Sequence, residues 1–510
     1  MNNKTVIAVV AVSALTILLC VFLVMSQSSD DGLPEGDDYL YVMYTDPLSN
    51  VNVVDVYESH MDGRSATPLE QRYRTSVGPD GINSKWVFDK NGLGPFNSFY
   101  AAINLTKESS VYENDDSAER RLSDSVGEVA YILNPDDLGS TLSGHRFDKE
   151  LYNVMLVIPT VYWSSDRITQ SETVGNLEAG KQYNILYMSS CPSYSLSGGK
   201  EIAGMKAYAH SASYNAGEAD FSTNVYPYLC IGVYESYITD SNDVVGSGLL
   251  VSQSGRAVSH NKTVDEFKGY ADALTPAGTK KLESDYQLWN YYQWTLCKIM
   301  SYTVMGSKNS QVMVGLGYSY DNESPAVSGS TDTVGFFGNA KATESESGII
   351  TTEAGRVSSK LFIENGWGSL NEFLGDSFVE GYEEDFQRLH AGNRLGGETM
   401  IESRNQPYTG GIWANVSEYK GISSTETKPS IWDMPYSTEK SAHPDDPTYP
   451  GDAMNGGDSG VYSIVVGGNW DHRHNNGAAF ACAGYPIDYT ADYRGARLAY
   501  LLGDLTTTSN

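Results

Sequence analysis

Short segments that alternate apolar and polar residues recur along the chain, and Gly, Asn, Pro and Asp separate them. Examples are "YLYVMY" from Tyr39 and "GEVAYIL" from Gly127, whereas "YNVMLVIPTVYW" from Tyr152 is a β-branched and aromatic run broken at Pro159, which indicates a buried strand leading to an edge. A period of two places every second side chain on one face of a strand, and the separating residues favour turns. The sequence therefore predicts many short strands, with a β-rich N-terminal region over residues 39–150.

One segment departs from this pattern. Residues 283–306, "ESDYQLWNYYQWTLCKIMSYTVMG", place apolar side chains near every third or fourth position, which is typical of a helix. Ser284 would cap its N-terminus and Gly306 would end it. The stretch that follows is rich in Gly, Ser and Asn without long periodic runs, so we expect long ordered loops there.

The longest apolar run lies at residues 5–25 and is long enough to cross a hydrocarbon core of ~30 Å as a helix. Lys4 precedes it and acidic residues follow, which places residues 1–4 in the cytoplasm and the bulk of the chain outside. We expect a transmembrane anchor, a single-pass location in the cell membrane and a short stalk at residues 26–38. A cleaved signal peptide is the alternative interpretation.

The net charge of −30 disfavours nucleic acid as a partner, because like charges repel. The cysteines beyond the anchor are too widely spaced for a zinc cluster. They predict either one or two disulfides or buried free thiols, and they are Cys191, Cys230, Cys297 and Cys482. Acceptor tripeptides for N-glycosylation agree with an outside location and begin at Asn104, Asn261, Asn322 and Asn415.

Several motifs follow one another in an order typical of a known family. They are "GPFNSFY" from Gly94, "VMLVIPTVYW", "YLCIGVYES", "YQLWNYYQWTLCKIMSY", "IENGWGSLNEFLGD", "GGNW" and "GARLAYLL". This series resembles the landmarks of the formylglycine-generating-enzyme/sulfatase-modifying-factor-like family. It is most similar to the non-catalytic branch, the C-type-lectin-fold variable proteins of diversity-generating retroelements. The resemblance covers about residues 70–502 and implies an α+β C-type-lectin-like domain at 151–502, followed by a tail at 503–510.

The region Asp471–Tyr493 lies between two segments with the character of a scaffold. In the family that the chain resembles, the matching region is rewritten by mutation of adenines in Asn-type codons, which never yields Lys, Glu, Gln, Met or Trp. None of these five types occurs in Asp471–Tyr493. The resemblance implies a ligand-binding surface made by Asp471, His472, Arg473, His474, Asn475, Asn476, Tyr485, Asp488, Tyr489, Asp492 and Tyr493. A Tyr- and Asn-rich loop that simply packs is the alternative.

The scaffold residues have physical roles that do not depend on the family. Trp367 supplies a large apolar surface, and Leu498 belongs to an alternating run typical of a nearly central strand. Arg497 is expected to form an internal ion pair or hydrogen bonds. The predicted frame of the variable segment consists of Trp367, Trp470, Gly495, Arg497 and Leu498.

Catalysis does not carry over from the enzymatic members of the family. Those enzymes bind copper through a close pair of cysteines after the Gly-Gly motif, whereas "NWDHRHNNG" contains none, and Cys482 alone does not supply two thiolates. His472 and His474 have the spacing of a metal pair, but no third ligand is evident. We therefore predict no catalytic residue and no cofactor, with structural Ca²⁺ left open for the acidic segments "GYEEDFQ" and "HPDDPTYPGD".

The sequence thus predicts a cell-surface recognition or adhesion protein that binds an external protein or glycan. An exported enzyme of the formylglycine-generating or carbohydrate-active type is one alternative, and a structural envelope protein is another. An enzyme should have a deep pocket with perturbed titratable groups, whereas a binding protein should have an exposed face rich in aromatic residues.

Overall fold

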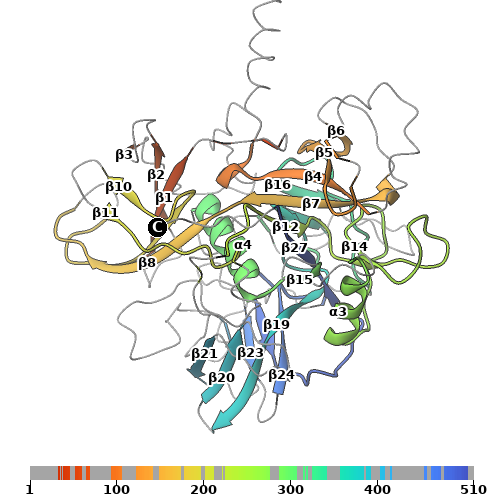
Figure 1. Ribbon diagram of the computed structural model, residues 1–510. Coiled ribbons are helices and arrows are strands. Elements are labelled where there is room, and N and C mark those ends of the chain that lie inside the picture. The colour runs from red at the N-terminus through yellow and green to blue at the C-terminus, as the bar shows by residue number, and fades with distance from the viewer. Residues whose placement is uncertain are drawn as a thin grey trace, which may run out of the picture.

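The architecture comes from a computed structural model of the chain (Figure 1). It describes residues 33–45, 52–59, 65–68, 93–105, 122–141, 149–173, 177–196, 201–211, 221–275, 286–306, 310–341, 357–391, 402–407, 414–415, 453–456, 461–471 and 476–503, with short gaps inside several of these ranges. Strands dominate these residues.

Three large sheets form the framework. The first runs in the order β11 (Glu201–Ile202), β10 (Tyr194–Leu196), β3 (Ser65–Pro68), β2 (Asn52–Ser59), β1 (Tyr39–Thr45), β9 (Gln182–Ser189) and β8 (Tyr162–Thr169). The second runs in the order β15 (Gln287–Leu288), β27 (Leu498–Leu502), β12 (Tyr228–Gly232), β7 (Tyr152–Pro159), β4 (Phe99–Asn104), β5 (Val129–Asn134) and β6 (Asp137–Thr141).

The third sheet contains the strands nearest to the predicted binding segment. Its order is β21 (Glu402–Pro407), β20 (Phe386–Ala391), β19 (Asn371–Glu383), β24 (Val461–Val466), β25 (Ala481–Ala483), β23 (Ala453–Gly456) and β22 (Ala414–Asn415), while β26 (Arg494–Ala496) pairs with β19. Two smaller sheets consist of β13 (Tyr237–Ile238) with β14 (Leu250–Val251), and of β16 (Phe337–Lys341), β17 (Val357–Leu361) and β18 (Ile363–Glu364). In Figure 1 the third sheet lies at the bottom of the view, and β4 and β7 cross the top.

The second sheet is buried on both faces. Along β7, Leu156 and Ile158 belong to one hydrophobic cluster, and Met155 and Val157 belong to another. Successive side chains of a strand point to opposite faces, so each residue of an uninterrupted apolar run packs into one of two cores. This is why "VMLVIP" lacks polar residues.

The two α-helices of the described residues lie in these two cores. α4 (Tyr291–Met305) is buried along its whole length and belongs to the first cluster, which also receives residues from all three large sheets. α3 (Val264–Asp272) contributes Val264, Phe267 and Ala271 to the second cluster. A helix packed on every side needs no polar face, which explains why apolar residues occur all around α4.

The ends of α4 follow from local capping. Asn290 and Gln293 form a reciprocal capping box, and Gly306 ends the helix with a φ of 62°. The predicted end at Gly306 is confirmed. The predicted cap at Ser284 is wrong: Ser284 lies outside the described residues, and Gln287–Leu288 instead form β15, which pairs with β27.

The predicted α+β fold class is also wrong, because the described residues are mostly β-sheet and their α-helix is confined to α3 and α4. Long-range pairing recruits short segments that have little local periodicity. β26, for example, has three residues and pairs in parallel with Asn371–Phe373. Such strands form because partners distant in sequence supply their hydrogen bonds, and a search for periodic patterns does not detect them.

No helix in the described part of the chain is long and apolar enough to span a bilayer. The predicted transmembrane helix, the membrane as a partner of residues 5–25 and the single-pass location in the cell membrane are therefore not supported by the structure. Residues 5–25, on which these predictions rested, lie outside the described residues.

The predicted domain boundary at 150/151 stays a prediction, although β4 on one side of it pairs with β7 on the other. Among the described residues, no disulfide joins Cys191, Cys230, Cys297 or Cys482, and the last three are buried. Asn104 is fully buried and its amide donates to Ser123 O and Ser125 O, so it cannot carry a glycan in this fold. Asn261 is exposed, and the Asn322 and Asn415 side chains lie outside the description.

Candidate functional site

The predicted binding segment divides into an inner and an outer part. Residues 476–483 are buried and include strand β25. Residues 484–493 leave β25 and return at β26, so they pass across the positions of β24 and β19 in the sheet order. Most side chains of this second part are partly or fully exposed. The accessible part of the segment is therefore residues 484–493.

The predicted contact residues likewise divide into exposed and buried ones. Asp471, Asp488, Tyr489 and Asp492 are exposed, and Tyr485 and Tyr493 are half-buried. Asn476 is fully buried: its side chain accepts from Asn469 N at 3.0 Å and donates to Asn469 O at 2.7 Å. It closes the base of a loop and has no free surface. The other four candidates, His472, Arg473, His474 and Asn475, lie outside the described residues.

The Gly-Gly motif before this loop has a steric reason. Gly468 adopts a φ of +82°, and a Cβ on it would lie 1.8 Å from Asn476 Oδ1. Only glycine combines the left-handed backbone with this close approach. Glycine at position 468 thus allows Asn476 to bridge the backbone of Asn469.

Three tyrosines of the outer part surround one arginine, and we call Tyr485, Tyr489, Tyr493 and Arg494 the tyrosine–arginine cluster. The rings of Tyr485 and Tyr489 stack, with centroids 4.7 Å apart and planes inclined by 17°. The Tyr489 and Tyr493 hydroxyl oxygens are hydrogen-bonded at 3.1 Å. The Arg494 Cζ lies 4.5, 4.7 and 6.0 Å from the three ring centroids, in that order.

Arg494 is the least expected member of the cluster. Its side chain is 1% exposed, and no hydrogen-bond acceptor among the described residues reaches its Nε or Nη1. Below it lies Phe373 of β19, at 5.6 Å from the guanidinium carbon. Burial lowers the pKa of the guanidinium, which remains a cation because its ordinary value is 12.5. Ring faces can compensate part of its desolvation, but they accept no strong hydrogen bond.

Backbone hydrogen bonds fix the segment that carries the tyrosines. Asn371 N donates to Tyr493 O at 2.9 Å, and Asn261 N donates to Ala491 O at 3.0 Å. An isolated antiparallel bridge joins Pro486 to Tyr462 of β24. The tyrosines are therefore held on an ordered loop attached to a sheet, an arrangement that limits the entropy lost on binding.

Arg497 organises the scaffold on the other side of β26. It is fully buried, and its Nε lies 2.8 Å from Glu372 Oε2, with a further ion pair from Nη2 to Glu372 Oε1. Its Nη1 donates to Gly232 O and Val233 O at 2.9 Å, and its Nη2 donates to Glu364 O at 2.8 Å. One side chain thereby joins β12, β18 and β19, so it is not available to a ligand.

A second buried carboxyl group lies beside this ion pair. Glu235 Oε1 accepts from Leu370 N at 2.8 Å. Burial and the neighbouring Glu372 raise the pKa of Glu235 well above its ordinary value, and Arg497 offsets only part of this effect. Burial also raises the pKa of Glu372. Two carboxyl groups thus compete for one guanidinium in a water-poor site.

The remaining predicted scaffold residues make packing contacts with neighbouring parts of the fold. Trp367 is buried and its Nε1 donates to Gly315 O at 3.0 Å. Trp470 is half-buried against Tyr318 and Ala326. Leu498 is fully buried, and a Cβ on Gly495 would lie 2.5 Å from Leu370 Cδ1, so a larger residue there would require the Leu370 side chain to move.

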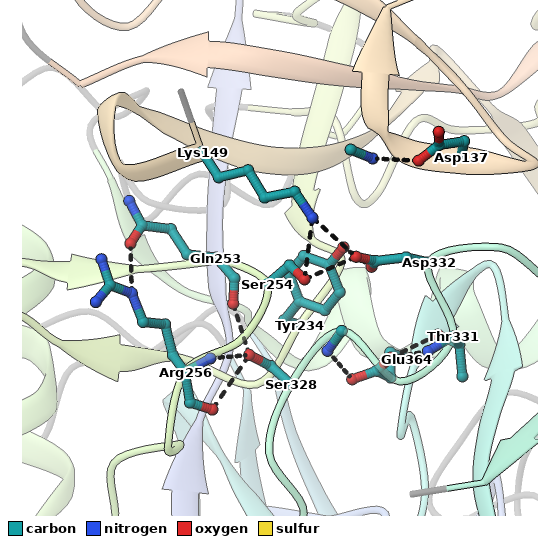
Figure 2. Close-up of polar contacts among 12 residues, drawn as sticks. Asp137, Lys149, Tyr234, Gln253, Ser254, Arg256, Ser328, Thr331, Asp332 and Glu364 are labelled. Atoms are coloured by element: carbon teal, nitrogen blue, oxygen red, sulfur yellow. Dashed lines mark hydrogen bonds and ion pairs between the residues drawn. The ribbon is translucent and has the colours of Figure 1, made fainter. Parts of the chain in front are cut away.

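A separate polar cluster lies around Asp332 and Glu364 (Figure 2). Asp332 Oδ2 accepts from Ser254 Oγ at 2.7 Å and pairs with Lys149 Nζ at 3.2 Å, and the Tyr234 hydroxyl donates to its other oxygen. Glu364 accepts from three donors of the adjacent turn, namely Gly329 N at 2.8 Å, Thr331 N at 2.8 Å and Thr331 Oγ1 at 2.6 Å. Both carboxylates are occupied in fastening residues 328–332 to the sheets.

Two titratable groups near this cluster, Lys360 and Glu364, have shifted pKa values that follow from their burial in the fold. Burial lowers the pKa of Lys360 to about 8, and its ammonium lies 4.7 Å from the Tyr100 ring centroid. Burial also raises the pKa of Glu364. Within the described ranges, no group of three or more His, Cys, Asp or Glu side chains is arranged to hold a metal ion. Bound Ca²⁺ and the absence of catalysis stay predictions.

Among solved structures, the chain has a distant structural neighbour. No family model matches the chain, and no curated protein sequence matches it. The solved structure named "Major Tropism Determinant P3c Variant" matches 68% of this chain and 73% of its own, at 10% sequence identity and a TM-score of 0.22. A likeness this weak carries no argument about family or function.

Sequence reasoning missed Arg494, Phe373 and Glu372. The available signal for Arg494 was its place at the end of a run that contains three tyrosines at intervals of four residues. Such a run favours cation–π contacts once a cation lies among the rings. No local signal identifies Glu372 as the partner of Arg497, because 125 residues separate them.

Proposed function

We propose that this chain is a recognition protein that binds an external protein or glycan non-covalently, through the tyrosine–arginine cluster and the exposed Asp488 and Asp492. The observation that carries the proposal is the geometry of residues 484–493. Stacked, partly exposed tyrosines project from an ordered loop between two strands of one sheet.

The chemistry of these side chains supports recognition. Tyrosine offers a large amphipathic surface with few rotatable bonds, so little entropy is lost when a ligand covers it. Tyr489 is 37% exposed and stacks on Tyr485, which restricts its ring further. Aromatic and arginine side chains supply most binding hot spots in protein interfaces. The cluster contains three of the former and one of the latter.

The direct test is a binding screen of the full chain against an array of glycans and a panel of purified cell-surface proteins. Any ligand found is then titrated against Tyr489→Ser and against Tyr270→Ser, which removes a half-buried tyrosine from helix α3. We expect Tyr489→Ser to weaken binding by at least about tenfold, and Tyr270→Ser to leave the Kd within a factor of about two.

Circular dichroism and thermal unfolding of both variants provide the control for folding. A ligand whose affinity falls equally in the two variants does not bind at the cluster. Binding that survives replacement of Tyr485, Tyr489 and Tyr493 by serine in a folded triple variant would exclude the proposed site.

Diversification of this surface is tested on DNA rather than on protein. The proposal expects a near-copy of the DNA that encodes the last forty or so residues, differing at adenines and lying beside a reverse transcriptase gene. Identical codons for residues 471–493 in neighbouring isolates, without such a copy, would exclude diversification. The binding proposal would remain open to its own test.

A further inference from the structure

The buried guanidinium of Arg494 differs from an ordinary structural cation in what surrounds it. Its contacts are the ring faces of Tyr485, Tyr489, Tyr493 and Phe373. Among the described residues it makes no ion pair, and its Nε and Nη1 have no acceptor although the side chain is 1% exposed. Arginine N–H groups are strong donors in a fixed fork, and leaving them unmatched in a buried place is costly.

The two acidic residues of the same segment do not pair with these donors. Asp488 and Asp492 belong to the same segment, are exposed, and take part in no ion pair with Arg494 in the described structure. The groups that favour its charged form are the Cys482 thiol and the three tyrosine hydroxyls, none of which is a carboxylate. The cation therefore has aromatic walls without a counter-charge.

We infer that Arg494 is the anchor of a carboxylate-binding position, and that the ligand of this surface presents a carboxylate group, such as that of an acidic sugar or an acidic side chain. The inference rests on the proposed function and specifies its ligand class. A carboxylate matches the guanidinium fork with two parallel hydrogen bonds, a fit that a neutral amide or hydroxyl group does not reproduce. The tyrosine rings would enclose the carbon skeleton next to the carboxylate.

Access to Arg494 requires movement of one ring. Tyr489 is the most exposed of the three, and only its stacking on Tyr485 and its hydroxyl bond to Tyr493 hold it over the arginine. A rotation of its side chain opens the cluster without a change in the backbone. Such a rotation must break the stacking on Tyr485 and the hydroxyl bond to Tyr493.

The test uses sodium benzoate and its neutral isostere benzamide as probes on the full chain, at one ionic strength set with sodium chloride. Binding is measured by calorimetry and by the shift of the thermal unfolding midpoint. We expect benzoate to bind at least about tenfold more tightly than benzamide, since charge-assisted pairs are about twice as strong as neutral ones. Arg494→Met should abolish this preference.

Arg256→Met is the matched control. Arg256 also lies over a tyrosine ring, at 5.1 Å from the centroid of Tyr237, but Asp243 already pairs with it at 3.0 Å. Benzoate binding should be unchanged in this variant. If Arg494→Met does not fold, Arg494→Lys replaces it: the charge is kept but the guanidinium fork is lost, and we expect a loss of benzoate affinity of about fivefold or more.

Equal binding of benzoate and benzamide, or benzoate binding that survives in folded Arg494→Met, would overturn the inference. Failure of this inference is distinct from failure of the proposed function. A ligand that depends on Tyr489 but leaves benzoate without effect would remove the carboxylate position and keep the recognition surface. Benzoate binding that requires Arg494, with no ligand from the screen, would keep the position and remove the broader proposal.

Discussion

Arg494 and Arg497 are buried cations three residues apart, and the groups that compensate their loss of hydration are of opposite kinds. Arg497 is fully buried and its guanidinium reaches one carboxylate and several backbone carbonyl oxygens. Arg494 is 1% exposed and meets aromatic rings without an acceptor for Nε or Nη1. The first belongs to the frame and the second to the surface that the frame supports.

The difference shows how one short stretch of chain combines rigidity with recognition. Completely matched donors lock Arg497 into place, since breaking any one bond leaves a buried polar group alone. Arg494 keeps unused hydrogen-bonding capacity, which the protein can hold only because the frame beside it is rigid. An unsatisfied buried group in a native protein calls for an explanation, and a functional role is one of them.

The largest expected effect comes from Arg497→Met. Removing this guanidinium leaves Glu372 and Glu235 buried without their cation, and we expect a loss of about 3–5 kcal/mol in the free energy of unfolding. Urea denaturation followed by tryptophan fluorescence measures it. Arg494→Met is the control and should cost less than about 2 kcal/mol, because it loses only ring contacts. Equal losses in the two variants would break the comparison.

The next effect separates two residues of the predicted contact set. Asn476→Ala removes two buried hydrogen bonds to Asn469, so we expect a loss of about 1–3 kcal/mol in the free energy of unfolding. Asp471→Ala, at an exposed position a few residues earlier, should change it by about 0.5 kcal/mol or less. Thermal unfolding of both variants measures the difference. Similar values would mean that Asn476 is not part of the frame.

A pH titration sharpens the description of the frame. Because burial raises the pKa of Glu235 above 4.5, the unfolded chain releases this proton at a lower pH than the folded protein does. Stability from this group therefore falls as pH rises above about 4.5. Glu235→Gln keeps an acceptor for Leu370 N and removes the titration. We expect it to gain more than about 1 kcal/mol over the wild type by pH 7, because one pKa unit is worth about 1.4 kcal/mol.

Denaturant midpoints of the two proteins at several pH values between 4 and 8 provide the measurement. Parallel curves would mean that the pKa of Glu235 is the same in the folded and the unfolded chain. Glu266→Gln on the exposed face of α3 is a suitable control. Exposed hydrogen bonds lower the pKa of Glu266, so its small contribution should have the opposite sign.

The smallest effect concerns the cluster itself. Tyr489→Phe removes one hydroxyl bond to Tyr493 at a partly exposed position, and we expect a change of about 0.5 kcal/mol or less in the free energy of unfolding. Thermal unfolding is the measurement. A loss comparable with that of Asn476→Ala would show that the cluster carries the frame, and the distinction between the two arginines would then fail.

Part of this molecule could be predicted from sequence. The uninterrupted apolar run of β7 required a strand covered on both faces, and the periodic segment before Gly306 required a helix that ends there. The assignment of Arg497 to an internal ion pair followed from a cation inside a strand that has no polar face. The α+β class was wrong, because it extended local patterns to the whole chain, and the membrane anchor finds no support among the described residues.

The sequence by itself determined the local elements and the segment 471–493 as a place of unusual chemistry, since periodicity and residue type act over a few positions. Only the tertiary structure decided which half of that segment is buried and which arginine obtains a carboxylate. Burial and charge pairing depend on partners such as Glu372 and Phe373, more than a hundred residues away along the chain. Folding alone brings them together.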